Sequence, residues 1–153
     1  MDQADERTLA RWREFVADGM PQPPASITQR DVPSPWHLPG KASAVIGMRR
    51  AGKTTFLHQV RAERLAAGVP LERLPYWNFE DQRLTGIRAE ELPVLLDEYY
   101  RRHPDLRRTH VVTLCLDEIQ VVAGWERFVR RLLDTETVEV FVSGSSAAML
   151  SRE

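Results

Sequence analysis

Residues 42–66 join a short apolar run to an amphipathic helical run through a loop that contains two glycines. Within this unit Gly47–Thr54 reads GMRRAGKT and satisfies the pattern G-x-x-x-x-G-K-[ST] at every position. A strand, a glycine loop and a helix start in this order place backbone N–H groups at a helix N-terminus, where the dipole favours anions. The unit therefore predicts a phosphate-binding loop in an α/β fold.

Each residue type in this loop has a separate physical task. Glycine lets the backbone curl around phosphate oxygens. Lys53 would place a point charge between the β- and γ-phosphates, and the Thr54 hydroxyl would be a ligand of Mg²⁺. Thr55 is expected beside the α-phosphate. The predicted nucleotide-binding residues are Gly47, Met48, Arg49, Arg50, Ala51, Gly52, Lys53, Thr54 and Thr55.

Strand-like and helix-like runs alternate along the rest of the chain. Residues 110–116 are almost continuously apolar, which is typical of a central strand covered on both faces by helices. Such alternation predicts an α/β architecture with a mostly parallel sheet. Further strands are expected at 74–79 and 137–144, with helices at 53–67, 89–102 and 124–134.

The first 40 residues have a different texture. Residues 5–18 carry apolar side chains at helical spacing, and residues 21–39 hold six of the ten prolines in the chain. Proline removes backbone donors, so an extended connector is expected there. We therefore expect two regions: an N-terminal helix with a proline-rich arm over 1–40, and a core over 41–153.

Composition narrows the class of protein. The 153 residues have 42% hydrophobic and 28% charged side chains with a net charge of −1, which fits one globular domain and predicts no general nucleic-acid or membrane-surface binder. The single Cys115, the unpaired histidine spacing and the acidic start predict no disulfide framework, zinc site or signal peptide. We expect a soluble cytoplasmic protein that spans no membrane.

Lysine is scarce in this chain. Of the 21 Lys and Arg residues, only Lys41 and Lys53 are lysine. A compact ammonium on a flexible stem suits phosphates, so Lys53 stands where its chemistry is needed. Arginine pairs such as Arg107-Arg108 could form basic patches, but the near-zero net charge favours solvated helix faces, and DNA binding stays open at this point.

Two carboxylates follow the most apolar strand. Asp117 and Glu118 come directly after residues 111–116, and they must emerge at the carboxyl end of that strand because burying them inside the sheet would be costly. Asp117 would then face the Mg²⁺ region, as Thr54 does. Glu118 would polarise the water that attacks the γ-phosphate. An Asp-Glu pair is often only a solvated turn, and the phosphate-loop motif is what favours the catalytic reading.

A serine-rich segment ends the last expected strand. Residues 143–146 read SGSS and reach the same sheet edge if that strand is parallel to its neighbours. A hydroxyl there could contact the γ-phosphate or the attacking water. Ser145 is the preferred sensor, followed by Ser143, although serines also cap helices. The predicted catalytic residues are Lys53, Glu118, Ser143 and Ser145.

The set GMRRAGKTT, YWNFED, LCLDEIQ with Trp125 just after it, and VSGSSAAML resembles bacterial and archaeal AAA-type (AAA+) P-loop ATPases over roughly residues 28–153. The resemblance implies that Gly47–Thr55 form Walker A, that Asp117 and Glu118 form Walker B, and that the serine segment holds the sensor. It also implies ATP and Mg²⁺ as ligands, in a three-layer P-loop NTPase fold with strand order 5-1-4-3-2.

This sequence departs from the family pattern at its end. The family continues through a Gly-Arg pair that offers an arginine finger, a fifth strand and commonly a C-terminal domain, whereas this sequence stops at Glu153. The expectation is a truncated core, completed by a partner or by a C-terminal domain that supplies the arginine finger. The first strand would otherwise be an exposed edge.

Three functions compete at this point. The leading one is an ATPase module that drives or gates a partner process, with slow turnover because an arginine finger contributes about 10³ to 10⁵ in rate. The second is a nucleotide-binding or interaction module that does not hydrolyse. A P-loop kinase for a small molecule is less favoured, because Glu118 suits the activation of water.

Overall fold

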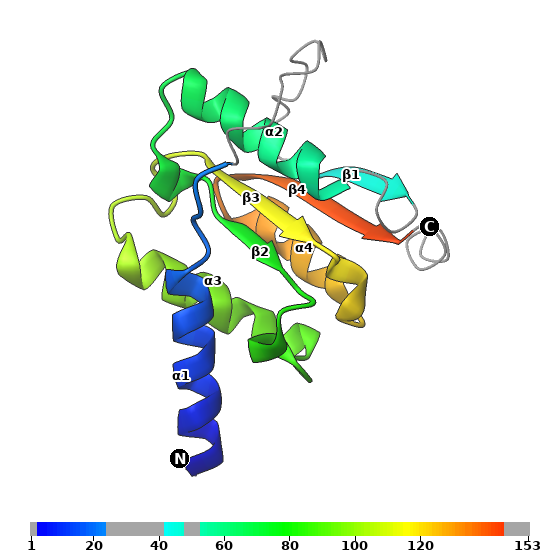
Figure 1. The fold of residues 1–153 in the computed structure, drawn as a ribbon. Helices are drawn as coiled ribbons and strands as arrows, with labels where there is room; N and C mark the ends of the chain where they lie inside the picture. Colours follow the sequence, from blue (N-terminus) through cyan, green and yellow to red (C-terminus); the bar gives the residue numbers. More distant parts are fainter. Residues whose placement is uncertain (1–2, 24–41, 48–52, 146–153) are drawn as a thin grey trace.

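The computed structural model describes residues 3–23, 42–47 and 53–145 (Figure 1). For residues 3–5, 42–47, 53 and 145 it describes the backbone alone. The predictions made for Met48, Arg49, Arg50, Ala51 and Gly52, for most of the proline-rich arm and for Ser146 lie outside the described residues.

The four described strands form one parallel sheet. They are β1 (Ala42–Gly47), β2 (Tyr76–Asn78), β3 (Val112–Asp117) and β4 (Val138–Ser145), in the order β1-β4-β3-β2. Each neighbouring pair is parallel. The predicted α/β P-loop NTPase fold is confirmed, since this is the 1-4-3-2 part of the expected order. A fifth strand is not among the described residues.

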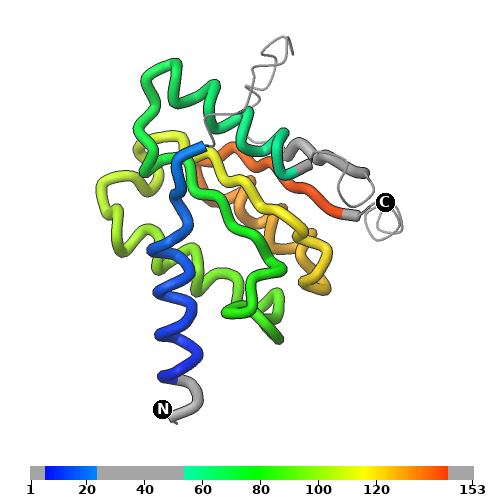
Figure 2. The backbone as a smooth tube through the Cα atoms, viewed as in Figure 1, coloured from blue at the N-terminus to red at the C-terminus, as the bar shows by residue number. Residues whose placement is uncertain are grey.

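Helices cover both faces of the sheet (Figures 1 and 2). Helix α2 (Lys53–Ala66) packs on one face, while α3 (Leu92–Arg102) and α4 (Trp125–Thr135) lie on the other, with α1 (Gln3–Ala17) packed against α3. Each face has its own apolar cluster, and β3 contributes to both because its six residues are all buried. Within the described ranges, every helix is too short or too polar to cross a membrane.

Two predicted elements differ in their bounds. The expected helix 89–102 is a single 3₁₀ turn at Ala89–Glu91 followed by α3, which has Pro93 in its first turn, where a missing N–H costs nothing. The expected strand 74–79 pairs only over β2, and Pro75 before it has no N–H to donate. Both differences arise at prolines.

The described part of the N-terminal region packs into the core. Trp12, Phe15 and Val16 of α1 are buried, and the ring of Phe15 lies 6.3 Å from that of Trp77. The chain then runs along β2, where the backbone N–H of Tyr76 donates to Gly19 O at 2.7 Å. This segment therefore contacts the edge of the sheet directly.

Candidate functional site

The carboxyl ends of the parallel strands converge on the start of α2 (Figure 1). Gly47 at the end of β1 is level with Ser145 of β4, and Asn78 at the end of β2 is level with Asp117 of β3. Helix α2 begins at Lys53, the last residue but one of the glycine motif. The predicted motif residues therefore share one sheet edge, where open α/β sheets bind ligands.

The Asp117 carboxylate is the centre of the described site. It is 1% exposed and accepts hydrogen bonds from three hydroxyls. Thr54 Oγ1 donates to Oδ2 at 2.7 Å, which joins α2 to β3 across 63 residues of sequence. Tyr76 also donates to Oδ2, and Ser143 donates to Oδ1. Three donors offset part of the cost of burying this charge.

Glu118 follows in an unusual backbone conformation. Its φ of 55° and ψ of 43° are left-handed, which a non-glycine residue adopts rarely, and the chain turns sharply there. The residue is 7% exposed, and Gln120 Nε2 donates to its Oε2 at 2.6 Å. The turn directly follows the hydroxyl cluster around Asp117, and the Gln120 amide holds the Glu118 carboxylate.

Ser143 and Ser145 both stay predictions as sensors, and the structure describes the side chain of Ser143 alone. Ser143 is fully buried, donates to Asp117 and accepts the backbone N–H of Glu118 at 3.2 Å, so its hydroxyl supports both carboxylate residues. The side chain of Ser145 lies outside the described part of the chain, as does that of Lys53. Their backbones stand at the same sheet edge, at the end of β4 and the start of α2.

Tyr76 and Gln120 belong to this site, although the sequence predicts no role for either residue. Gln120 could have been found, because it lies two residues past Glu118 inside the DEIQ motif. Tyr76 carried no such signal, since its contact with Asp117 spans 41 residues. Burial, together with the hydrogen bond to Asp117, raises the pKa of Tyr76, so the phenol keeps its proton as a donor.

A second ring supports Tyr76 from α2. The His58 ring lies 4.4 Å from the Tyr76 ring at an interplanar angle of 35°. Arg61 is fully buried and donates to His58 Nδ1 at 3.0 Å. Burial, with Arg61 beside it, lowers the pKa of His58 to about 4. His58 is therefore neutral near pH 7, with Nδ1 as acceptor and the ring proton on Nε2.

The donor set fits the ligands that the motif predicts. Thr54 supplies a hydroxyl and Asp117 a carboxylate, and such hard oxygen atoms are what Mg²⁺ prefers, with the remaining positions taken by water and phosphate. In the described ranges no group of three or more His, Cys, Asp or Glu residues could hold a metal ion. The set therefore suits an ion shared with a nucleotide.

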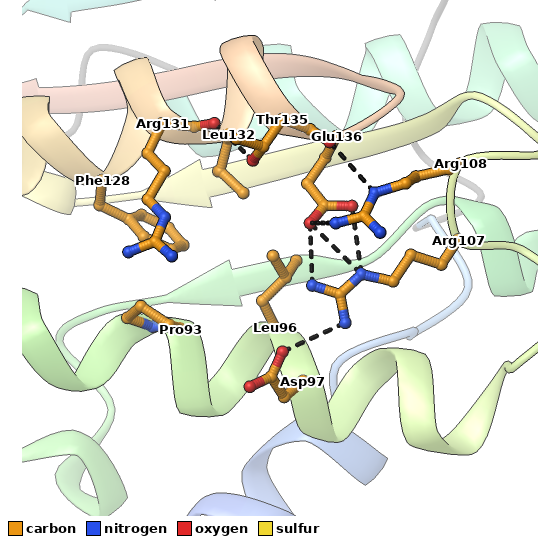
Figure 3. Close-up of a pocket in the computed structure, with 10 residues that line it drawn as sticks. All are labelled: Pro93, Leu96, Asp97, Arg107, Arg108, Phe128, Arg131, Leu132, Thr135 and Glu136. Atoms are coloured by element: carbon orange, nitrogen blue, oxygen red, sulfur yellow. Dashed lines mark hydrogen bonds and ion pairs between the residues drawn. The ribbon is translucent and has the colours of Figure 1, made fainter.

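A separate pocket lies between α3 and α4 (Figure 3). Its volume is about 180 Å³ and it is formed where the loop before β3 meets the turn before β4, far along the strands from Asp117. Arg107 donates to Glu136 at 2.8 Å and to Asp97 at 3.2 Å. The charges of Arg107, Asp97 and Glu136 therefore neutralise one another inside the pocket. These ion pairs connect the loop before β3 to α3 and to the turn before β4. Its lining residues include Pro93, Leu96, Phe128, Arg131 and Leu132.

Two of the adjacent arginine pairs in the described part of the chain form ion pairs with carboxylates. Arg101 and Arg102 both lie within 3.4 Å of the Glu98 carboxylate, and Arg107 and Arg108 share Glu136. A guanidinium already paired with a carboxylate offers less to a phosphate backbone. These contacts favour solvated surface residues over a DNA-binding patch for these two pairs. Arg49 and Arg50 lie outside the described residues.

The sheet order, the helix start at the glycine motif and the Thr54–Asp117 contact define a P-loop NTPase-like protein. A family profile described as an AAA domain matches residues 39–153. The chain belongs to this AAA domain family. No solved structure matches it.

Two curated relatives are also similar to this chain. An uncharacterized protein of Methanocaldococcus jannaschii is 36% identical over 129 residues, which are 84% of this chain and 26% of the relative. An uncharacterized protein of Haemophilus influenzae is 30% identical over 110 residues, which are 71% of this chain and 26% of the relative. The chain thus spans about a quarter of the length of each relative.

Proposed function

We propose that this chain is an ATPase module that binds ATP with Mg²⁺ and hydrolyses it to drive or gate a partner process. The observation that carries the proposal is the 2.7 Å hydrogen bond from Thr54 to Asp117. It brings together the hydroxyl at the end of the glycine motif and the carboxylate at the end of the central strand. Family membership supports nucleotide binding by this domain.

Separate residues of the site are proposed to bind phosphate, hold the metal ion and activate water. Lys53 and the N-terminus of α2 would attract the phosphates, and Thr54 and Asp117 would hold Mg²⁺, which would supply positive charge to neutralise the phosphates. Glu118 orients and deprotonates the attacking water. Ser143 keeps Asp117 and the Glu118 backbone in place, and Ser145 is proposed to contact the γ-phosphate.

Glu118 already has a hydrogen-bond partner, because Gln120 Nε2 donates to its Oε2 at 2.6 Å. An ionised carboxylate has about four acceptor sites, so Glu118 can also accept a hydrogen bond from water, and this contact does not separate hydrolysis from binding alone. A non-hydrolysing nucleotide-binding module is therefore the second candidate function. Measured ATP turnover distinguishes the ATPase from the binding module. In the leading proposal, the arginine finger would come from a partner or from a further domain.

The test compares two charge-removing variants in separate assays. Lys53→Ala should weaken the binding of a fluorescent ATP analogue at least tenfold, because it removes the phosphate-binding charge. Lys41→Ala is the matched control, since Lys41 is the other lysine of the chain. Equal binding by Lys53→Ala and the wild type would overturn the nucleotide site.

Hydrolysis is measured on the second variant. Glu118→Gln should bind the analogue as the wild type does and release γ-phosphate about 10² to 10⁴ times more slowly, as expected for loss of a general base. Glu90→Gln, a change at an exposed carboxylate, is its control. No release by the wild type would leave the binding module as the function. Transfer to an added acceptor would indicate a kinase.

A further inference from the structure

Tyr76 shares the Asp117 oxygen that also accepts the Thr54 hydroxyl. Both donate to Oδ2, while Ser143 alone donates to Oδ1. The two groups on Oδ2 come from different elements, α2 and β2, and Ser143 comes from β4. Donors from three separate elements therefore restrict the rotation of the Asp117 carboxylate.

The sheet register explains how the phenol reaches this carboxylate. Tyr76 is level with Cys115, two residues before Asp117 on β3, and side chains two residues apart on a strand point to the same face. That face is the one covered by α2, because Tyr76 packs with Leu57 and Cys115. A tyrosine ring bridges the length of two strand residues, roughly 7 Å.

The ring is held by residues that are themselves immobilised. His58 stacks on it, and the Arg61 guanidinium carbon lies 6.0 Å from its centroid. Arg61 donates to Leu74 O at 2.7 Å and to Pro21 O at 2.6 Å, as well as to His58. Backbone carbonyls of two segments that are far apart in the sequence thus fix Arg61, and through it the rings of His58 and Tyr76. The phenol hydroxyl is pre-positioned for Asp117.

We propose that Tyr76 is a positioning residue that orients the Asp117 carboxylate for Mg²⁺ in the nucleotide complex. The inference rests on the proposed function, because it concerns the same Mg²⁺-nucleotide site. Mg²⁺ demands near-ideal octahedral geometry, so a carboxylate that can rotate is a poorer ligand. Groups that hold a metal-ligating carboxylate by hydrogen bonds commonly contribute 10- to 100-fold in metal affinity.

The experiment measures how Mg²⁺ supports nucleotide binding, without any reading of turnover. A fluorescent ATP analogue is titrated into the purified chain in EDTA, and Mg²⁺ is then titrated at a fixed analogue concentration. Tyr76→Phe keeps the ring and removes only the hydroxyl. We expect its half-saturating Mg²⁺ concentration to rise 10- to 100-fold, with binding in EDTA within about twofold of the wild type.

Tyr99→Phe is the matched control. Like Tyr76, which is partly buried, Tyr99 has a hydroxyl that donates one hydrogen bond, to Glu72 O at 2.5 Å, but Tyr99 is fully buried and lies on α3. It should lose similar stability and keep the wild-type Mg²⁺ dependence. If Tyr76→Phe does not fold, His58→Ala provides the test, because it removes the stacking partner and should raise the Mg²⁺ requirement several-fold.

The outcomes distinguish this inference from the function on which it rests. An unchanged Mg²⁺ requirement in a folded Tyr76→Phe protein would overturn the role of Tyr76 alone. The same conclusion follows if the variant loses nucleotide binding in EDTA to the same extent, or if Tyr99→Phe shifts the Mg²⁺ requirement equally. A wild-type protein that binds no nucleotide would instead overturn the proposed function.

Discussion

The buried ion pair between α2 and β4 makes the stability of this fold sensitive to one carboxylate. Arg64 Nε and Nη2 donate to the two Glu139 oxygens at 2.8 and 3.2 Å, and the Thr113 hydroxyl donates to Glu139 Oε1 at 2.5 Å. Arg64 is 3% exposed and Glu139 5% exposed. The pair therefore has little access to water, and each charge depends on the other.

Glu139→Gln should destabilise the chain by about 3 kcal/mol. The amide keeps one oxygen acceptor, but its NH₂ group faces a guanidinium donor, and the buried Arg64 charge loses the carboxylate that accepts two of its hydrogen bonds, a change that typically costs about 3–5 kcal/mol. Glu63 lies 3.8 Å from Arg64 and offsets part of this loss. For a domain of this size the melting temperature should fall by about 6–12 °C.

Urea unfolding followed by circular dichroism measures this change, with Glu90→Gln as the surface control. The triple variant Arg64→Met, Glu139→Leu, Thr113→Val tests the cause, because replacing a buried pair by apolar side chains is commonly neutral or stabilising, and Thr113→Val removes the buried hydroxyl that would lose its acceptor. It should lie within about 1 kcal/mol of the wild type. A loss below about 1 kcal/mol in Glu139→Gln, or a triple variant as unstable as the single one, would refute the argument from the buried charge.

Two further predictions concern α2 and the turn after α1. The pKa of His58 is about 4 in the folded chain, against its usual value of 6.5. Between these two pH values the unfolded chain binds more protons than the folded chain, so the stability of the fold should decrease as the pH drops from about 6.5 to 4. In His58→Gln this pH-dependent loss of stability should be smaller by about 1–2 kcal/mol, a value that is reduced because the ring is half-exposed. Urea unfolding at several pH values measures it, and equal pH profiles for the variant and the wild type would contradict the prediction. Gly19→Ala would place a Cβ 2.7 Å from Nε1 of the buried Trp77 ring, and should cost about 1–3 kcal/mol with a shift in tryptophan fluorescence. Wild-type stability in this variant would show that the ring moves freely.

Local patterns in the sequence were sufficient for the architecture. The order of strands and helices, the start of α2 at Lys53 and the end of β3 at Asp117 follow from apolar periodicity and from the glycine motif. Parallel pairing then places the carboxyl ends together, which brings Thr54 to Asp117. These features depend on neighbouring residues and on general rules of chain connection, and the sequence contains both.

Hydrogen-bonding partners could not be predicted in the same way. Ser143, the second candidate for a contact with phosphate or water, stays a prediction in that role, but the partners of its buried hydroxyl, Asp117 and the Glu118 backbone, were not predicted. Gln120 was visible in its motif, but its contact with Glu118 depends on the left-handed turn at Glu118. Each outcome was decided by which donor lies nearest once the backbone is folded.

The sequence by itself determined the fold class, the phosphate-loop motif and the strand end that bears the two carboxylates. Only the tertiary structure decided that Tyr76 donates a hydrogen bond to the Asp117 carboxylate and that His58 and Arg61 hold the Tyr76 ring in place. The physical reason is that an apolar period is a property of adjacent residues, whereas the Tyr76 hydrogen bond joins atoms 41 residues apart in the chain. Such a contact exists only after the register between β2 and β3 has been set.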